Sequence, residues 1–495
     1  MLDLWIKGGE LVDGSGGEVR VADVGVSGGK VVAVGRVEGP AHRTLEAEGA
    51  WVTPGFVDLH THYDLCLDWG GLTEHCLRQG ITSVIGGNCG LGSPDVAAVL
   101  ARARRAELGV HFGVLAPLGP VRSRVVPRHE GRAASPEELP RVVAALSEAL
   151  DAGALGVSWG PYHENTLIGP QELQACLREA ARRGRPYCVH RRSEGVGGLA
   201  ATVEALEQAR ECGVALQISH LKSAGRQNWG ELEAVLSRIE AARREQDVSA
   251  DVYPYDASLT YLSAVLPNEL KAAGRLHELL NTREGRRQAR AGIEGWFVER
   301  MGPGSIVLLV PSLPQVARGS TLTEACAALE LSDPVEAALK LIEADPRATG
   351  GWAIYREMMN PEQVETILDL PWVAVASDAV PEEEEGSSTR LSAHPRVYSC
   401  FSRALTRALK RGGTRGLADA VRRATAFPAQ RFGLKRGRIQ VGAPADLVLL
   451  RDPDAGGDYS EPERYPQGVE TVLVSGEVAF TEGEVVARRG GLLGY

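Results

Sequence analysis

The sequence predicts an α/β protein: a closed barrel of parallel strands with a small sheet domain made from both chain ends. Between residues 52 and about 265, short apolar runs alternate with helical stretches rich in Ala, Leu, Glu and Arg. Repeated strand and helix units imply a parallel sheet, and this many favour a closed barrel. The chain of 495 residues has room for one barrel of roughly 300 residues with appendages.

The two ends of the chain share a different pattern, in which apolar and polar residues alternate between glycines. This pattern is typical of short antiparallel strands joined by tight turns. We expect residues 1–53 and 434–495 to pair into one small sheet domain. The predicted strands include residues 4–6, 24–26, 31–34, 445–450, 472–474 and 478–480.

The barrel is predicted to occupy residues 54–265 and 347–433, with an inserted subdomain at residues 266–346. Candidate barrel strands include residues 83–85, 187–189 and 215–218. The intervening region has longer helical stretches and is broken by Pro303, Gly304, Pro311 and Pro314. Strand and helix units resume at residues 361–377 and continue into a helix at residues 402–411. No repeat of 20 to 50 residues suggests a solenoid or propeller.

Composition excludes several classes of protein. The formal net charge is −10, which argues against nonspecific binding to nucleic acid. Hydrophobic residues make up 44% and charged residues 24%, as in an ordinary globular protein. We expect no membrane-spanning helix, no signal peptide and a cytoplasmic location, since neither pattern occurs. The eight Cys are scattered, so a disulfide framework is not expected.

Two histidines follow a short apolar run near the start of the barrel. His60 and His62 are two residues apart, and side chains at positions i and i+2 of a strand point to the same side. Both imidazoles would therefore face one centre at the barrel mouth, where barrel enzymes bind their ligands.

Four more potential metal ligands follow other predicted strands: Cys89, His190, His220 and Asp378. Imidazole nitrogen, thiolate and carboxylate are the usual ligands of zinc. Taken singly, Cys89 is also a candidate buried apolar residue, each histidine a candidate core residue, and Asp378 a candidate turn or helix cap. Together, six such groups at five strand ends favour a metal centre.

The same motifs resemble those of the N-acyl-D-amino-acid deacylases, or D-aminoacylases, of the amidohydrolase superfamily. The resemblance runs from Leu4 to about Val486, nearly the whole chain. It is carried by residues 58–64 (Asp-Leu-His-Thr-His-Tyr-Asp), 86–90 (Gly-Gly-Asn-Cys-Gly), 153–158 (Gly-Ala-Leu-Gly-Val-Ser), 190–194 (His-Arg-Arg-Ser-Glu), 219–222 (Ser-His-Leu-Lys), 251–255 (Asp-Val-Tyr-Pro-Tyr), 377–378 (Ser-Asp) and 394–396 (His-Pro-Arg).

The resemblance implies a distorted (β/α)8 TIM-like barrel, a β-sandwich from both chain ends, and a small insert after the sixth strand. It also implies one tightly bound zinc ion, held by Cys89, His190 and His220. A second, weaker metal site would use His60, His62 and Asp378, with Cys89 able to bridge the two.

The implied reaction is hydrolysis of the amide bond of an N-acyl-D-amino acid by metal-activated water. Asp378 would act first as general base and then as general acid. By the same resemblance, Arg396 binds the substrate carboxylate, assisted by Lys222 and Tyr253. A surface arginine, a solvated lysine and a core tyrosine are the alternative interpretations of these three residues.

Hydantoinases and dihydroorotases, which share the barrel, bridge two metals with a carboxylated lysine on the fourth strand. The fourth-strand candidate here, residues 154–160, contains no lysine, and Lys222 lies two residues past His220. This difference disfavours the hydantoinase interpretation and leaves Cys89 as the candidate bridge.

Some segments depart from the family pattern without removing a ligand: residues 116–122 lack a Gly-His turn, Ala379 follows Asp378, and residues 397–403 differ after the His-Pro-Arg motif.

Four consecutive glutamates at residues 382–385 are expected in a loop over the barrel mouth. Such a run is usually solvated; alternatively, it would disfavour acidic substrates by repulsion.

Two alternatives to the deacylase remain. One is another amidohydrolase acting on a cyclic amide or a different N-acyl amine. The other is a metal-free scaffold protein on the same fold, although such proteins typically lose ligands that this chain keeps. The expected partner is a small N-acyl-D-amino acid, with no nucleic acid or membrane; the side chain, the acyl group and the oligomeric state stay open.

Overall fold

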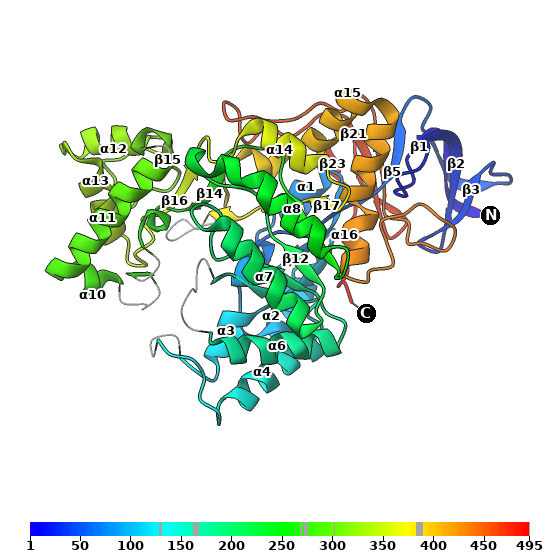
Figure 1. The fold of residues 1–495 in the computed structure, drawn as a ribbon. Helices are drawn as coiled ribbons and strands as arrows, with labels where there is room; N and C mark the ends of the chain where they lie inside the picture. The colour runs from blue at the N-terminus through cyan, green and yellow to red at the C-terminus, as the bar shows by residue number, and fades with distance from the viewer. Residues whose placement is uncertain are drawn as a thin grey trace.

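The computed structural model describes residues 1–127, 131–161, 168–267, 270–271, 276–300, 302–382 and 390–494 (Figure 1). Its centre is a barrel of parallel strands, in two hydrogen-bonded sheets. One sheet has the order β6-β7-β8 and the other β17-β13-β12-β11-β10-β9. The strands are β6 (Phe56–Asp58), β7 (Ile81–Gly86), β8 (His111–Val114), β9 (Ala116–Pro117), β10 (Val157–Trp159), β11 (Tyr187–Val189), β12 (Leu216–Ile218), β13 (Val248–Val252) and β17 (Val373–Val375).

The two sheets join into one distorted ring. On one side, β8 leads through Leu115 directly into β9, which pairs with β10. On the other side, a bridge between Thr61 and Ala379 links the segments that follow β6 and β17. There the Asp378 amide donates to the His60 carbonyl at 2.9 Å. The predicted distorted (β/α)8 TIM-like barrel is confirmed, and its closure brings two predicted ligand segments together.

The barrel strands are short and buried along their whole length. Helices cover their outer side, so both faces of each strand are buried, and the few polar residues in the strands, such as Ser158 and Gln217, are buried with them. Side-chain caps fix some helix starts: Asp95 accepts from the Ala98 amide and Asn360 from the Glu362 amide. The helices around the barrel are α1 (Leu72–Leu77), α2 (Val96–Arg105), α3 (Leu118–Ser123), α4 (Leu139–Asp151), α6 (Pro170–Arg182), α7 (Gly198–Cys212), α8 (Leu232–Ala242), α14 (Pro361–Leu368), α15 (Pro395–Ala424) and α16 (Ala426–Arg431).

Both chain ends contribute to one nine-stranded sheet, beside the barrel in Figure 1. The ends meet where β5 pairs antiparallel with β20. Val448 and Leu450 belong to the core shared with the barrel, whereas Leu447 and Leu449 pack in the sheet domain's own core. The strands are β1 (Leu2–Leu11), β2 (Arg20–Ser27), β3 (Lys30–Gly35), β4 (Ala41–Glu46), β5 (Trp51–Pro54), β20 (Leu447–Leu450), β21 (Val469–Val474), β22 (Glu477–Thr481) and β23 (Glu484–Val485).

The inserted subdomain forms a separate lobe with its own apolar core (Figure 1). It follows β13, which is the seventh barrel strand in chain order when β8 and β9 are counted as one continuous strand, so the implied position after the sixth strand is wrong. Its sheet has the order β14-β16-β15, and the predicted bounds 266 and 346 lie between β14 and β16. The elements are β14 (Ser258–Tyr261), α10 (Leu276–Leu280), α11 (Arg283–Glu299), β15 (Ile306–Leu308), α12 (Leu322–Ala328), α13 (Pro334–Ala344) and β16 (Trp352–Tyr355).

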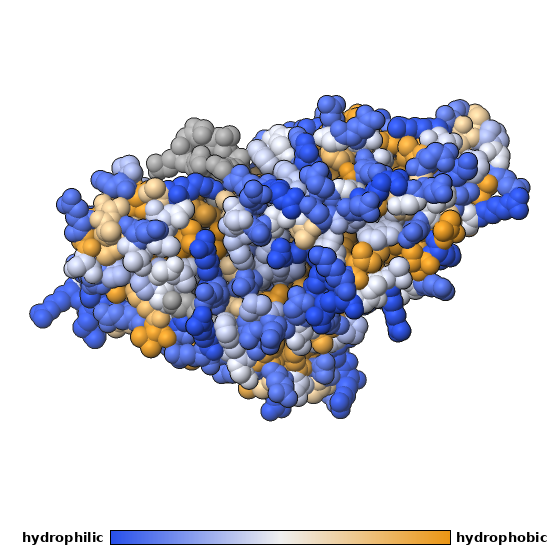
Figure 2. Space-filling model, turned by 90° about the horizontal axis from the view of Figure 1, so that it is seen from above, coloured by the Kyte–Doolittle hydropathy of each residue, from blue (hydrophilic) through white to orange (hydrophobic). Residues whose placement is uncertain are grey.

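The outer surface is mostly polar. Hydrophilic side chains cover much of the face in Figure 2, with small apolar patches between them. Within the described ranges, no helix is both long enough and apolar enough to cross a membrane.

Candidate active site

The six predicted metal ligands lie in one buried cluster at the carboxyl ends of the barrel strands. His60 and His62 follow β6, and Cys89 follows β7. His190, His220 and Asp378 follow β11, β12 and β17 respectively. Their side chains form three overlapping groups, within each of which the potential ligand atoms lie within 4.8 Å of one another: His60, His62 and Cys89; Cys89, His190 and His220; and His60, His220 and Asp378.

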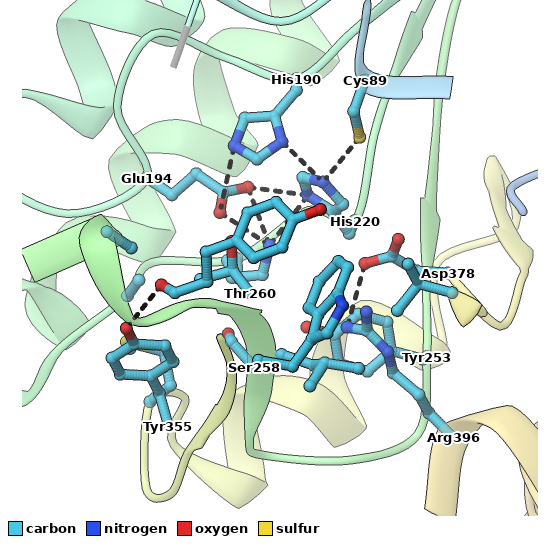
Figure 3. Close-up of a pocket in the computed structure, with 18 of the residues that line it drawn as sticks. Cys89, His190, Glu194, His220, Tyr253, Ser258, Thr260, Tyr355, Asp378 and Arg396 are labelled. Atoms are coloured by element: carbon cyan, nitrogen blue, oxygen red, sulfur yellow. Dashed lines mark hydrogen bonds and ion pairs between the residues drawn. The ribbon is translucent and has the colours of Figure 1, made fainter. Parts of the chain in front are cut away.

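Cys89 belongs to two of these groups and lies beside His220 (Figure 3). Its Sγ is 3.3 Å from His60 Nε2 and 3.5 Å from His220 Nε2. His220 Nε2 is in turn 3.1 Å from His190 Nδ1. Burial by itself would raise the pKa of the Cys89 thiol, but the nearby His60 and His220 rings hold that pKa well below its usual range. The site therefore favours a thiolate, the form of cysteine that binds metals.

Asp378 contacts both the histidine pair and a cation. Its Oδ1 is 3.4 Å from His60 Nε2 and 3.3 Å from His62 Nε2. Its Oδ2 lies 2.9 Å from Arg396 Nη1. Burial opposes ionisation of this carboxyl, yet Arg396 and His60 keep its pKa well below the ordinary value. Asp378 thus joins the potential ligands on one side to the pocket on the other.

The donor set fits a zinc ion. Ligands bound at about 2.1 Å in a tetrahedral arrangement lie roughly 3.4 Å from one another. The donor-atom separations around Cys89 and His220, 3.1 to 3.5 Å, match that spacing. One sulfur, imidazole nitrogens and one carboxylate also form the mixed donor set that zinc accepts.

Three of these side chains sit on strained backbone. Cys89, His220 and Asp378 have φ values of 55°, 34° and 49°. Non-glycine residues rarely adopt this left-handed conformation, and where they do, it clusters at functional sites. Each residue comes just after a strand, where the sharp turn directs its side chain into the barrel mouth.

Two further carboxylates, one buried and one partly exposed, support the histidines from behind. Asp251, on β13, lies 3.0 Å from His60 Nδ1 and accepts the His220 amide at 2.8 Å. Glu194 lies 2.8 Å from His220 Nδ1. A carboxylate on the far ring nitrogen fixes the orientation and tautomer of a ligand histidine. Both residues were quoted within motifs above, but the sequence indicated no role for either.

The three residues predicted to bind the substrate carboxylate, Arg396, Lys222 and Tyr253, line the pocket next to the cluster and are called the clamp below. Arg396 is 1% exposed, and its guanidinium lies 4.6 Å from the centre of the Tyr253 ring. Lys222 Nζ lies 2.8 Å from both carboxylate oxygens of Glu194. His394 caps α15 by accepting from the Arg396 amide at 3.0 Å. The His-Pro-Arg motif is therefore the start of a helix that holds Arg396 at the pocket.

The inserted subdomain supplies a wall of this pocket. Residues from β14, α11 and β16 line it, together with Arg300 just after α11. No sequence motif indicated this contribution, because the apolar pattern of the insert reflects its own core. The run of glutamates at 382–385, predicted over the barrel mouth, lies outside the described residues except for the backbone of Glu382.

Comparison with known proteins agrees with the fold and the cluster. Sequence models of the amidohydrolase family match residues 51–224 and 322–480. An L-hydantoinase from Arthrobacter aurescens shares the fold at a TM-score of 0.56 over the full length of both chains, with 19% identity. The fold is that of an amidohydrolase.

More similar relatives identify one family within the amidohydrolases. N-acyl-D-glutamate deacylase and D-aminoacylase of Alcaligenes xylosoxydans xylosoxydans are 33% and 30% identical, covering 99% and 98% of this chain and 96% and 98% of theirs. The structure of N-acyl-D-glutamate deacylase from Bordetella bronchiseptica, complexed with zinc and a phosphonate inhibitor, has a TM-score of 0.83 and 29% identity over all of both chains. This chain belongs to the N-acyl-D-amino-acid deacylase family of amidohydrolases.

Proposed function

We propose that this protein hydrolyses N-acyl-D-amino acids to a carboxylate and a free D-amino acid. The main support for the proposal is that the potential metal ligands and the clamp residues share one pocket. Six potential ligands from five strand ends meet at the floor of a pocket whose wall carries Arg396, Lys222 and Tyr253. Family membership supports the same reaction.

Zinc is the proposed metal, held tightly by Cys89, His190 and His220. His60, His62 and Asp378 form the second, weaker site, and Cys89 belongs to donor groups on both sides. When bound, zinc supplies Lewis acidity that brings the pKa of water toward about 7 and polarises an amide carbonyl.

Asp378 is the proposed general base and acid. One carboxylate oxygen faces the histidine pair and the other faces Arg396, so the group reaches both the ligand cluster and the substrate pocket. It takes a proton from the attacking water and delivers it to the departing amine nitrogen. Asp378 would therefore be needed in both halves of the reaction.

The clamp orients the substrate. The planar guanidinium of Arg396 suits two parallel hydrogen bonds to the α-carboxylate. Tyr253 packs under that guanidinium, and Lys222 Nζ, 6.0 Å from the centre of the same ring, adds a second positive charge. With the carboxylate and the amide fixed, D and L substrates exchange the positions of the side chain and the hydrogen on the α-carbon. The proposed preference for D substrates therefore requires room for the side chain at only one of these two positions.

Release of free amino acid from matched N-acetyl-D and N-acetyl-L amino acids tests the proposal. We expect turnover of the D series by the zinc-loaded protein, and strong loss in the Asp378→Ala and Cys89→Ala variants. Hydantoin is the control substrate for a cyclic amidase. Turnover limited to L substrates would refute the assignment, and full activity of Asp378→Ala would refute the mechanism.

A further inference from the structure

The turn that carries Cys89 has a strained backbone. It follows β7 and comprises residues 87–90 (Gly-Asn-Cys-Gly), called the cysteine turn below. Gly87, Cys89 and Gly90 have φ values of 73°, 55° and 71°. Glycine adopts such values freely, but at Cys89 the Cβ atom is crowded by the backbone. Contacts from elsewhere in the fold must therefore hold the turn in this conformation.

Asn88 joins the cysteine turn to the strand end that carries His60. The Asn88 side chain is buried. Its amide nitrogen lies 3.3 Å from the carbonyl oxygens of both Leu59 and Thr61, and 3.0 Å from that of Ile85. Because Leu59 and Thr61 flank His60, these hydrogen bonds determine how closely the cysteine turn approaches that histidine.

Ser158 joins the same turn to the other side of the cluster. It lies on β10 and is fully buried. Its Oγ accepts the Gly90 amide at 3.2 Å and donates to the Gly87 carbonyl oxygen, so one hydroxyl bonds both ends of the turn. β10 pairs with β11, after which the His190 amide donates to the Trp159 carbonyl oxygen at 3.0 Å. The Ser158 hydroxyl thus fixes the turn relative to the strand that carries His190.

We propose that Asn88 and Ser158 are positioning residues that hold the Cys89 thiolate between the two halves of the metal centre. The inference rests on the proposed function, in which Cys89 belongs to both the tight and the weak metal site. Cys89 Sγ lies 3.3 Å from His60 Nε2 and 3.5 Å from His220 Nε2. Asn88 acts on the His60 side, which is the weak site, and Ser158 acts on the opposite side, which is the tight site.

This division of roles follows from the geometry of a shared ligand. A thiolate that serves two sites has to meet two sets of ligand distances at once, each within about 0.2 Å. Without the hydrogen bonds from one side, the strained backbone at Cys89 relaxes and moves the sulfur away from that side. Loss of either residue should therefore weaken metal binding mainly at the site that the residue faces.

The test variants are Asn88→Ala and Ser158→Ala, which remove the hydrogen bonds and keep all six potential ligands. Thr73→Val is the matched control. It also removes a buried hydroxyl that accepts a backbone amide, since Thr73 Oγ1 accepts the Gly109 amide at 2.9 Å. That bond lies away from the cluster, where the chain enters β8.

The full chain, freed of metal by a chelator, is titrated with Zn²⁺ against a chromophoric competitor and separately with Co²⁺. The zinc titration gives the affinity of each site, and the charge-transfer absorption of a cobalt–thiolate bond reports on Cys89. We expect Asn88→Ala to weaken the second zinc ion by about 10- to 100-fold and the first by less than about threefold. Ser158→Ala should weaken the first zinc ion by about 10- to 100-fold and reduce the cobalt–thiolate band. Thr73→Val should change neither affinity by more than about twofold.

Wild-type affinities in both variants, equal weakening of both sites by each variant, or binding of only one zinc ion by the wild-type protein would overturn the inference. Ser158→Ala removes a single oxygen atom, so it decides the question if Asn88→Ala does not fold. None of these measurements depends on turnover. A wild-type protein that binds two zinc ions but hydrolyses no N-acyl-D-amino acid would refute the proposed function alone, and an active wild type whose two variants bind zinc normally would refute only the inference.

Discussion

Two largely buried groups of side chains in this molecule each combine a histidine, a carboxylate and a cation, but the two groups have different roles. At the pocket, Glu194 lies 2.8 Å from His220 Nδ1 and 2.8 Å from Lys222 Nζ. At the opposite end of the barrel, where β8 begins, Asp446 lies 3.0 Å from His111 Nε2 and 2.7 Å from an Arg436 nitrogen. The second group joins the barrel to the sheet domain, since Asp446 immediately precedes β20.

The difference lies in the remaining ring nitrogen of each histidine. His111 Nδ1 accepts the Gly491 amide at 3.2 Å, so both of its nitrogens are used within the fold. His220 Nε2 instead faces Cys89 Sγ and His190 Nδ1. The same chemical group is therefore structural where its histidine is fully bonded, and suited to metal binding where a nitrogen faces other donors.

Removing each histidine should separate the two groups most clearly. His220→Ala should lower kcat/KM by more than about a hundredfold, beyond the usual effect of an outer residue, because it deletes a ligand. The purified variant should hold less zinc by elemental analysis. His111→Ala should instead destabilise the fold by about 3 kcal/mol, since Asp446 loses a buried partner.

The control measurement is turnover per folded molecule. We expect His111→Ala to keep wild-type kcat/KM within about twofold below its unfolding temperature, because its site lies at the other end of the barrel. Full zinc content and activity in His220→Ala would contradict the assignment of His220 as a ligand.

Neutralising each carboxylate gives the next largest effect. Glu194→Gln should weaken zinc binding by about 10- to 100-fold, because Glu194 orients His220. Competition with a chromophoric chelator measures that affinity directly, apart from activity. Asp446→Asn, the matched variant, should leave zinc affinity unchanged and lower the unfolding temperature. If the two variants bind zinc equally, Glu194 has no positioning role.

The sequence predicted the strand ends well because short apolar runs followed by polar residues have few other interpretations. All six potential ligands lie at such ends. The supporting carboxylates were missed for a physical reason. Asp251 meets His60 across 191 residues of sequence, and His111 meets Asp446 across 335. Those contacts exist only once the barrel has closed and the chain ends have paired.

The insert was harder to predict for a different reason. Its helices and strands pack around their own core. The spacing of apolar residues in the insert therefore indicates which residues form that core, but not which ones line the pocket. Arg300 reaches the pocket through its fit between Gly195 and Gly225. No local pattern in the sequence predicts such a contact between domains.

Replacing a buried arginine by lysine, at the pocket or in the structural group, gives a smaller contrast. Arg396→Lys should raise KM for N-acyl-D-amino acids by about tenfold, because an ammonium loses the two parallel hydrogen bonds of the fork. Arg436→Lys should leave KM unchanged. Steady-state kinetics on both variants check this, and an unchanged KM for Arg396→Lys would remove Arg396 from the clamp.

The smallest expected effect is a pH dependence of stability at the structural group. Burial alone would raise the pKa of Asp446, but the hydrogen bond from His111 and the charges of His111 and Arg436 hold it below the ordinary value. A carboxyl whose pKa is lower when folded stabilises the protein above its unfolded pKa of about 3.9, and that contribution disappears as pH falls through the folded value. Between pH 5 and pH 3, the unfolding temperature of zinc-free wild type should therefore fall about 1–2 °C more than that of Asp446→Asn. Parallel falls would show that the Asp446 charge adds no stability, which would leave its hydrogen bonds alone to hold the barrel to the sheet domain.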